Sequence, residues 1–358
     1  MKILEFIPSL NGGGAEKLVF DLSLQFAKKH QVKILTYYDE SSSDRCKKLI
    51  ENGIEVLTLG KKTGLSVKSF FMTSKIIKKF KPDIIHTHLH VNFYILPYYF
   101  VHKKQIGFHT VHNIAEKEQT GIHKKITNWL YHNRKVTPVA IGDIIAESIV
   151  KEYKIEKKDF PLIYNGIDLQ KFSNNKSFSK VKNFIAIGRL SLQKNYSLML
   201  DAFSLAITQY PDLTLTVLGS GDLAEQLNEM TKKLGLDKVV NFVGNVSNVY
   251  EYIFNADCMI MSSDYEGLPL SMIECIASGL PIISTNVGSV VELVKDNENG
   301  FLCDAKNVDA LAECIVKMVN ADKNLINMMS QKSKEISQQF DITKCSENYE
   351  KAFEGTTN

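Results

Sequence analysis

Arginine is scarce in this chain. Only three of its 43 basic residues are arginines (Arg45, Arg134 and Arg189), and the formal net charge is +3. A protein that binds nucleic acid along a basic stripe carries more positive charge and more arginine. The composition therefore excludes nucleic acid as the expected partner.

Paired cysteines and long apolar runs are also missing. The six cysteines form no C-x-x-C pair and no His-Cys cluster, which is typical of reduced, buried thiols and not of disulfides or a zinc site. No apolar run reaches the roughly 18 residues that span a membrane, and no secretion signal opens the chain. We expect a soluble cytoplasmic protein.

Both halves of the 358 residues alternate short apolar runs with amphipathic stretches. This alternation predicts parallel sheets covered by helices, and the length suffices for two domains. The fold class is therefore α/β, with two doubly wound Rossmann-like domains. We expect strands at 1–7, 32–37, 54–59, 83–88, 183–187, 213–218, 239–243, 258–261 and 281–285, and helices at 15–30, 67–80, 195–209 and 223–234.

We place the N-terminal domain at 1–172 and the C-terminal domain at 173–336. The boundary follows from 173–182, which is polar and lacks aliphatic periodicity, as linkers do. A last helix within 337–358 could pack on either domain, and we assign it to the first. Open parallel sheets bind ligands beyond the carboxyl ends of their strands, so we expect the two domains to face a cleft.

A helix start after the strand at 258–261 predicts an anion site. Pro269 suits the first helical position, and Gly279 ends the helix. The free amides near Leu270 and Ser271 would favour a phosphate. Glu266 lies just before this helix and Glu274 lies inside it.

Carboxylates beside a phosphate are better placed over hydroxyls, from which each can accept hydrogen bonds. A nucleotide sugar has such hydroxyls on both sides of its diphosphate. The alternative is that Glu266 caps the helix and Glu274 is a solvated surface residue. Taken one at a time, the glutamates favour the alternative, and the whole stretch 256–304 favours the nucleotide sugar.

Glu266 and Glu274 resemble the E-x7-E signature of retaining family-4 glycosyltransferases with the GT-B fold. Each further match is weak alone, but together their order and spacing are specific. They comprise Gly12–Glu16, Tyr164–Asp168, Gly188–Leu190, Lys194–Asn195, Ser278–Pro281, Gly288, Glu292 and Asn299–Gly300.

Arg189 ends a predicted strand, and Lys194 lies at the next helix entry. A diphosphate leaving group needs cations because negative charge builds on it; arginine offers a planar fork of donors and lysine a mobile point charge. Lys194 alone would be one lysine among many. By the resemblance, both bind the donor diphosphate.

The resemblance implies a retaining enzyme without cofactor or metal. It would move a hexose or N-acetylhexosamine from a nucleotide-diphosphate sugar, by family habit a UDP-sugar, to a glycan or lipid-linked acceptor in bacterial surface polysaccharide or glycolipid synthesis. The expected catalytic residues are His112, Glu266, Arg189 and Lys194. The expected donor-binding residues are Gly13, Gly14, Arg189, Lys194, Gly219, Glu266, Gly267, Leu268, Leu270, Ser271 and Glu274.

Two other functions remain open. A non-catalytic nucleotide-sugar-binding subunit of a glycosyltransferase complex would share the donor site. An NAD-type dinucleotide-binding enzyme would use the glycines at 12–14 and Asp39 as a ribose ligand, but Lys17 occupies the position of the third glycine of G-x-G-x-x-G.

Histidines cluster in the first half. His86, His88 and His90 would share one face of a strand, as in a metal site. We do not favour a metal, because no carboxylate lies at matching spacing and the chain lacks a D-x-D pair. His112 best matches the family's active-site histidine, with His109 as a competitor, and we assign His88 and His109 to the acceptor side.

The segment 91–102 is apolar and aromatic but too short to cross a bilayer. We expect a buried helix interrupted by Pro97. The alternative is an interfacial surface with Lys124, Lys125 and Trp129, which would place the protein at the cytoplasmic membrane face.

Overall fold

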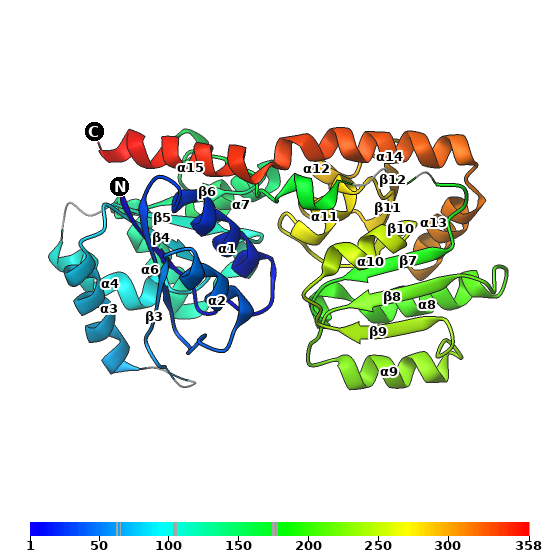
Figure 1. Ribbon diagram of the computed structural model, residues 1–358, viewed down its shortest axis with the longest axis horizontal. Helices are drawn as coiled ribbons and strands as arrows, with labels where there is room; N and C mark the ends of the chain where they lie inside the picture. Colours follow the sequence, from blue (N-terminus) through cyan, green and yellow to red (C-terminus); the bar gives the residue numbers. More distant parts are fainter. Residues whose placement is uncertain (62–63, 65, 103–105, 174–175, 177, 358) are drawn as a thin grey trace. The chain divides into compact units, whose positions relative to one another are not determined.

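The computed structural model describes residues 1–61, 64, 66–102, 106–173, 176 and 178–357. The chain divides into two units (Figure 1). Unit 1 comprises Met1–Gly166 and Ile342–Asn358, and unit 2 comprises Ile167–Asp341. The sequence-based boundary at 172 thus lies inside unit 2, and the last helix belongs to unit 1.

Unit 1 contains a six-stranded parallel sheet in the order β3-β2-β1-β4-β5-β6. Helices cover the sheet, so most of its strand residues are buried, including the two histidines of β4. The predicted doubly wound α/β architecture is confirmed. The strands are β1 Lys2–Phe6, β2 Gln31–Thr36, β3 Glu55–Thr58, β4 Ile84–His88, β5 Ile106–Val111 and β6 Val136–Ala140.

The helices of unit 1 include one from the far end of the sequence. The helix α15 packs against α1, and its Tyr349 and Phe353 are fully buried against Phe26. The helices are α1 Gly14–Phe26, α2 Asp44–Glu51, α3 Val67–Phe80, α4 Asn92–Val101, α5 Ala115–Glu118, α6 Gly121–His132, α7 Asp143–Tyr153 and α15 Ile342–Thr357, with a 3-10 turn η1 Lys157–Asp159.

Pro97 does not interrupt α4, contrary to the sequence-based expectation. The helix runs through it from Asn92 to Val101, and the proline ring lies on the exposed side. Within the described residues, no helix combines the length and apolarity needed to cross a bilayer.

Unit 2 repeats the architecture of unit 1. Its six parallel strands have the order β12-β11-β10-β7-β8-β9. They are β7 Asn183–Ile187, β8 Thr214–Leu218, β9 Val240–Gly244, β10 Cys258–Met261, β11 Ile282–Thr285 and β12 Gly300–Cys303.

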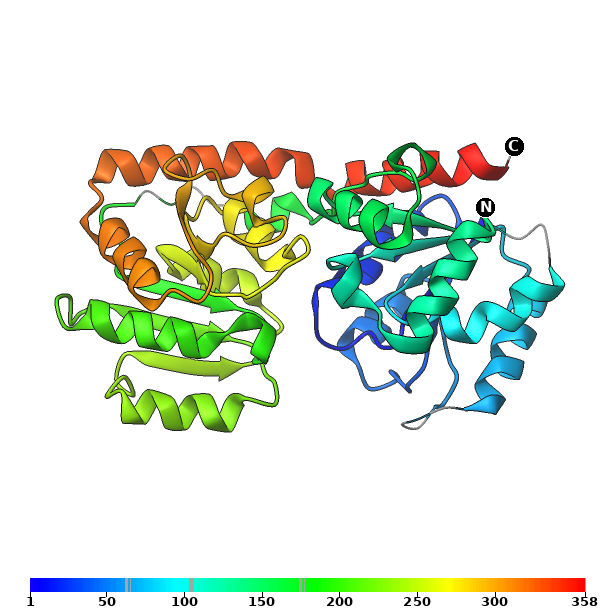
Figure 2. The same cartoon turned by 180° about the vertical axis from the view of Figure 1, so that it is seen from behind.

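Helices cover this second sheet (Figure 2). Part of the expected linker belongs to the unit, since Phe178 and Val181 are buried; residues 174–175 and 177 lie outside the described chain. The helices are α8 Tyr196–Ile207, α9 Ala224–Lys233, α10 Val249–Asn255, α11 Leu270–Ala277, α12 Val290–Leu293, α13 Val308–Asn320 and α14 Lys323–Ser337, with 3-10 turns η2 Leu169–Phe172, η3 Leu192–Lys194 and η4 Gln338–Phe340.

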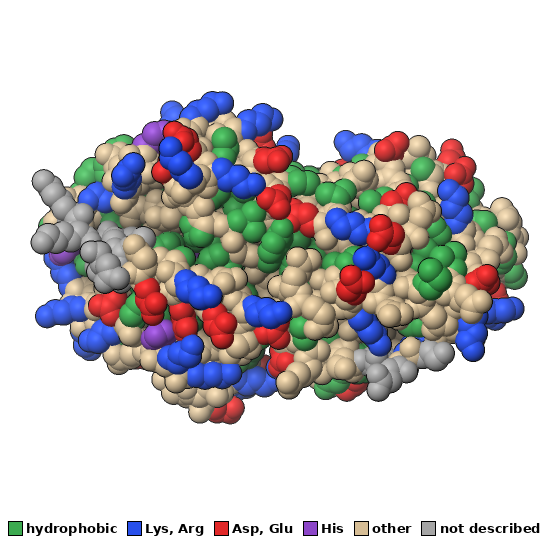
Figure 3. Space-filling view, turned by 90° about the horizontal axis from the view of Figure 1, so that it is seen from above, with side chains coloured by type: hydrophobic (Ala, Val, Ile, Leu, Met, Phe, Trp, Pro, Cys, Tyr) green, Lys and Arg blue, Asp and Glu red, His purple; other side chains and the backbone are tan. Residues whose placement is uncertain are grey.

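Basic and acidic side chains are interspersed on the face of the molecule shown in Figure 3. That face has no continuous basic stripe, in agreement with the small net charge of +3.

Candidate active site

The strand order of unit 2 reverses at β7. Strands β8 and β9 follow on one side, and β10, β11 and β12 lie on the other. Doubly wound sheets bind ligands at the carboxyl ends of the strands that flank such a reversal. The loops 188–195 and 262–269, which follow β7 and β10, leave the sheet at this point.

Hydrogen bonds tie these two loops together. The Asp264 backbone N–H donates to the Gln193 carbonyl at 2.8 Å, and the Asn195 amide donates to the Asp264 carboxylate at 2.9 Å. Ser262 Oγ donates to the Lys194 carbonyl at 3.0 Å. The loops therefore present their side chains as one assembly.

Lys194 and Glu266 form an ion pair across these loops. Lys194 Nζ lies 2.5 Å from Glu266 Oε1, and the side chains are only 17% and 6% exposed. Ser263 Oγ donates to the same Oε1. Glu266 Oε2 makes no hydrogen bond with a described residue, so it can accept from a ligand hydroxyl.

The start of α11 faces the same loops. Pro269 is the N-cap residue (φ −72°, ψ 112°) and not the first helical residue as expected. The backbone N–H groups of Leu270 and Ser271 make no backbone hydrogen bond with the described chain, and Ser271 Oγ donates to the Ile187 carbonyl at 3.2 Å. These amides and the helix dipole suit an anion.

The structure shows neither the helix cap expected of Glu266 nor the solvated surface position expected of Glu274 under the alternative interpretation. No side chain caps the start of α11, so Glu266 is not a helix cap. Glu274 is 4% exposed and therefore not a solvated surface residue. As predicted, Gly279 ends the helix, at φ 78°.

Glycines allow the chain to pass close to this site. A Cβ on Gly288, whose φ is +51°, would lie 1.9 Å from the Glu266 carbonyl oxygen, and one on Gly219 would lie 2.0 Å from the Gly188 carbonyl oxygen. Packing therefore explains why residue 219 is a glycine, in addition to the contact with the donor that we expect of it. Gly267 and Leu268, in the loop before α11, are buried, and the Gly267 carbonyl accepts a hydrogen bond from the Ser289 backbone N–H.

Arg189 follows the end of β7 and is exposed. Within the described chain its guanidinium makes no hydrogen bond and no ion pair, unlike Lys194. It is therefore a cation that can turn toward a ligand without first losing an internal partner.

In unit 1 the strand order reverses between β1 and β4. Gly13 and Gly14 follow β1, Gly13 as the N-cap residue and Gly14 as the first residue of α1. His88 ends β4 and His112 follows β5. The candidate residues of unit 1 therefore also lie at the carboxyl edge of their sheet.

The expected absence of a carboxylate near the histidines is wrong. Glu5, in the neighbouring strand β1, contacts His86 Nδ1 at 3.1 Å and His88 Nε2 at 2.8 Å, and all three side chains are fully buried. Nothing in the local sequence indicates this contact, because Glu5 and His86 become neighbours only through strand register.

Burial acts to raise the pKa of Glu5, but its contacts with His86 and His88 outweigh this and lower it to about 2. Burial, with the neighbouring His86, lowers the pKa of His88 to about 3. The ligand atoms of Glu5, His86 and His88 lie within 4.8 Å of one another, close enough for a metal site. Hydrogen bonds with His86 and His88 already explain both contacts of the Glu5 carboxylate without a metal.

His90 does not share their face, since β4 ends at His88 and the chain turns at Leu89 (φ 58°). His109 is 1% exposed and is held by Thr87 at 2.9 Å and Gln119 at 3.2 Å. His88 is fully buried. Burial therefore contradicts the expected acceptor contacts of His88 and His109.

His112 is half-buried and contacts His88: His112 Nε2 lies 2.9 Å from His88 Nδ1. Burial, with the nearby His88, holds the pKa of His112 well below its ordinary value. His112 is thus a neutral imidazole at the carboxyl edge of β5.

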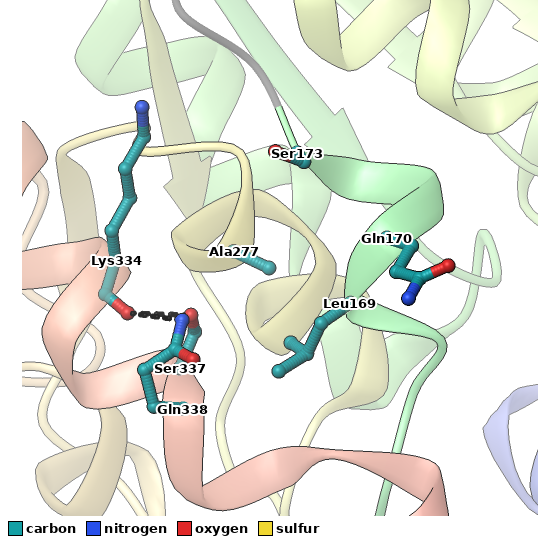
Figure 4. A pocket seen from close by; sticks show the side chains of 7 residues that line it. All are labelled: Leu169, Gln170, Ser173, Ala277, Lys334, Ser337 and Gln338. Carbon is teal, nitrogen blue, oxygen red and sulfur yellow. Dashed lines mark hydrogen bonds between the residues drawn. The ribbon is translucent and has the colours of Figure 1, made fainter.

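A pocket of about 290 Å³ lies elsewhere in unit 2 (Figure 4). It is bordered by Ala277, at the carboxyl end of α11, and by Lys334. The carboxyl end of a helix carries partial negative charge and disfavours a diphosphate. This pocket is therefore distinct from the anion site at the start of α11. Its other lining residues are Leu169, Gln170, Ser173, Ser337 and Gln338.

Two family models match adjacent parts of the chain. Residues 12–171 match Glycosyltransferase Family 4, and residues 168–336 match Glycosyl transferases group 1. An uncharacterized glycosyltransferase of Haemophilus influenzae is 32% identical over 169 residues, 47% of this chain. The match spans 48% of that relative, so about half of its length.

A longer match joins the chain to a Campylobacter jejuni enzyme, GalNAc-alpha-(1->4)-GalNAc-alpha-(1->3)-diNAcBac-PP-undecaprenol alpha-1,4-N-acetyl-D-galactosaminyltransferase. It is 27% identical over 350 residues and covers 94% of each chain. Among solved structures, Anabaena HepE in complex with UDP-glucose has a TM-score of 0.86 at 18% identity, covering 99% of this chain and 100% of that one.

The family models, the relatives and the two parallel-sheet units agree with one another and with the signature around Glu266 and Glu274. The chain belongs to the family-4 glycosyltransferases and has the GT-B fold.

Proposed function

We propose that this protein transfers a sugar from a nucleotide-diphosphate sugar to a glycan or lipid-linked acceptor. The observation that carries the proposal is the Lys194–Glu266 pair beside the free amides at the start of α11, where the strand order of unit 2 reverses. Cations, amides and a carboxylate acceptor at one sheet edge match a diphosphate next to sugar hydroxyls.

In this function each group of unit 2 has a separate task. Arg189, Lys194 and the amides of Leu270 and Ser271 hold the diphosphate, whose charge grows as the glycosidic bond breaks. Glu266 accepts from hydroxyls of the transferred sugar, and Glu274 accepts from the ribose. On unit 1, Gly13, Gly14 and His112 serve the sugar end of the donor.

The reaction we propose retains the configuration at the anomeric carbon. The bond from that carbon to the phosphate oxygen breaks, the bond to the acceptor oxygen forms on the same face, and the acceptor proton passes to the departing phosphate. The protein supplies charge and position, and no metal takes part. Activity that survives EDTA treatment is the expected result; activity lost to EDTA and restored by a divalent cation would contradict this part.

Two similarities support the substrate classes. The name of the Campylobacter relative specifies a diphospho-undecaprenol acceptor and an N-acetylgalactosaminyl donor group, and the Anabaena protein is solved with UDP-glucose. We therefore propose a UDP-hexose or UDP-N-acetylhexosamine donor and a lipid-linked acceptor of a bacterial surface glycan.

A panel of nucleotide sugars tests the proposal. One UDP-sugar should raise the melting temperature most, since a ligand stabilises the state that it binds, and should be consumed when membrane lipid extract is added. Slow hydrolysis of the same donor without acceptor would separate an enzyme from a non-catalytic binding subunit. If none of the donors bind, the function is wrong.

A lipid-linked acceptor requires access to a membrane surface. Helices α3, α4 and α6 of unit 1 expose large apolar side chains beside exposed lysines, and α4 packs against both neighbours. Phe71 and Val101 are both 73% exposed, and the Phe100 ring packs against Trp129 in a tilted arrangement, with ring centroids 4.8 Å apart. We name this surface the α3–α4–α6 face; its apolar members are Val67, Phe71, Phe100, Val101 and Ile122, and its exposed lysines are Lys68, Lys75, Lys78, Lys79 and Lys125. Lys124 is only partly exposed and pairs with Glu152 of α7.

Such a mixture suits the interface of an anionic bilayer. We propose that the α3–α4–α6 face holds the protein at the cytoplasmic membrane face. Vesicles containing phosphatidylglycerol should retain the wild type at low salt and lose a Phe71→Ser/Val101→Ser variant. Equal retention of both, with equal melting temperatures, would exclude this face.

A further inference from the structure

We propose that Glu5 and His88 are positioning residues that hold His112 in the tautomer with its proton on Nε2. In that tautomer His112 Nδ1 can only accept a hydrogen bond, and it therefore selects a donor sugar that presents a hydroxyl there. The step from tautomer to sugar rests on the proposed function, whereas the tautomer itself does not.

The argument starts at the Glu5 carboxylate. Its two oxygens contact different imidazoles, Oε1 with His86 Nδ1 at 3.1 Å and Oε2 with His88 Nε2 at 2.8 Å. An ionised carboxylate has no proton to donate, and the low pKa of Glu5 keeps it ionised. Both imidazoles must therefore donate to it.

This contact fixes the proton of His88. A neutral imidazole carries one N–H, and its other nitrogen accepts; the low pKa of His88 keeps the ring neutral. With the proton on Nε2, His88 Nδ1 is an acceptor. The atom 2.9 Å away is His112 Nε2, which must then donate.

The other half of the network is consistent with the same proton count. With its proton on Nδ1, His86 accepts at Nε2 from Thr110 Oγ1 at 2.8 Å, and the Tyr349 hydroxyl lies 2.8 Å from Thr110 Oγ1 and can donate to it. Every contact in the series Tyr349–Thr110–His86–Glu5–His88–His112 then has one donor and one acceptor. A metal held by Glu5, His86 and His88 would replace these protons, so the two arrangements exclude each other.

The end of this series determines what His112 can do. Its ring is neutral because its pKa is lowered, so with the proton on Nε2 the Nδ1 atom carries a lone pair. Within the described residues His112 Nδ1 has no hydrogen-bond partner. A ligand hydroxyl can donate to it, and a ligand group that can only accept cannot.

Long-range proton–nitrogen correlation spectra of protein labelled with ¹⁵N-histidine test the tautomer directly. A His112→Asn spectrum assigns the signals. The expected wild-type result is a protonated Nε2 and an unprotonated Nδ1 for His112. A proton on Nδ1, a doubly protonated ring, or loss of the pattern on chelation would overturn the proposal. This measurement needs neither substrate nor a folded Glu5 variant.

Two variants test the positioning. Glu5→Leu removes the acceptor, so His88 and His112 should exchange tautomers and show averaged nitrogen shifts. His86→Asn is the matched control: it disturbs the same buried network, but its amide can still donate to Glu5. The control should leave the His112 pattern unchanged, and an unchanged pattern in folded Glu5→Leu would contradict the positioning role.

Measurements of turnover distinguish a failure of this proposal from a failure of the proposed function on which it rests. Glu5→Leu should lower kcat about 5- to 10-fold, the effect of one hydrogen bond, without changing UDP affinity. With the wild type, a donor with fluorine in place of the selected hydroxyl should lower kcat by the same factor of about 5 to 10. With the Glu5→Leu variant, the fluorinated donor should lower kcat little further. If no donor reacts but the His112 tautomer is as stated, the proposed function fails and the positioning stands.

Discussion

Lys194 Nζ lies 2.5 Å from Glu266 Oε1 in a largely buried position. The two residues come from different loops, one after β7 and the other after β10, and their charges neutralise each other where we propose that the ligand binds. The pair therefore holds each side chain in place before a ligand arrives.

Breaking this pair from either side should be costly. Lys194→Met leaves the Glu266 carboxylate buried with only Ser263 as a partner, and we expect the free energy of unfolding to fall by about 3 kcal/mol. The free energy of unfolding of the Lys194→Met/Glu266→Gln double variant should fall by less than the sum of the decreases in the two single variants. Urea unfolding measures all three.

The exposed pair of Lys182 and Asp212, with side chains 49% and 59% exposed, is the control. Lys182→Met should change the free energy of unfolding by less than about 1 kcal/mol. Strict additivity at Lys194 and Glu266 would show that the two side chains are not coupled in solution.

Arg189→Ala should reduce turnover far more than stability. Arg189 is exposed and has no internal partner among the described residues, so its removal leaves the fold intact. Loss of one cation on a developing diphosphate charge should lower kcat about 10²-fold. Steady-state kinetics and a melting curve measure both effects, with exposed Lys238→Ala as the control. Unchanged kcat would remove Arg189 from the donor site.

Glu274→Gln should weaken UDP binding about 10-fold or more, because a hydrogen bond to a charged group is worth about 1.5–3 kcal/mol. Titration calorimetry with UDP measures this, with the exposed Glu229→Gln as the control. A variant that loses stability but keeps its UDP affinity would give Glu274 a structural role only.

Gly288→Ala should displace Glu266. The new Cβ would lie 1.9 Å from the Glu266 carbonyl oxygen, and φ is +51°. Gly235→Ala is the matched control, since its φ is +68° but nothing lies within 4 Å; it should cost about 1 kcal/mol from backbone conformation alone. Gly288→Ala should cost clearly more and also lower UDP binding. If both variants lose the same free energy of unfolding, the backbone at Glu266 must move away from the new Cβ without cost.

Acidification should destabilise unit 1 in two stages. His88 and His112 have pKa values below the ordinary 6.5, so below pH 6.5 the unfolded chain takes up protons that the folded chain does not. Their contribution to stability is complete above pH 6.5 and is lost as the pH falls from there toward 3. Glu5, with its pKa lowered from 4.5 to about 2, adds a further loss below pH 4.5.

Melting temperatures between pH 8 and pH 4 measure this dependence. His88→Asn should flatten the curve between pH 6.5 and 5, whereas His132→Gln should not, because the His132 ring is exposed. A wild-type melting temperature that rises on acidification would reverse the sign of the argument.

The fold was accessible from the sequence because its signals are local. The apolar runs of β7 and β10 and the helix α3 have the predicted bounds, since burial on both faces of a parallel strand requires a continuous apolar segment. Pro97 was misjudged because a proline can remain in a helix where its ring lies on the exposed side.

The candidate site was only partly accessible. Glu266 and Glu274 lie on one short segment, so the sequence alone places one just before α11 and the other inside it. The Glu5 contact depends on the register between β1 and β4, and the burial of His88 and His109 depends on what packs over the sheet. Register and packing are properties of the assembled unit, and residue spacing does not contain them.

The placement of α15 has a consequence for synthesis on the ribosome. The six strands of unit 1 are complete at Ala140, but Tyr349 and Phe353, which bury part of that unit, are made roughly 200 residues later. Unit 2, which is continuous in sequence, emerges in between. The sheet of unit 1 must therefore remain incompletely covered on the ribosome until all of unit 2 and then α15 have been made.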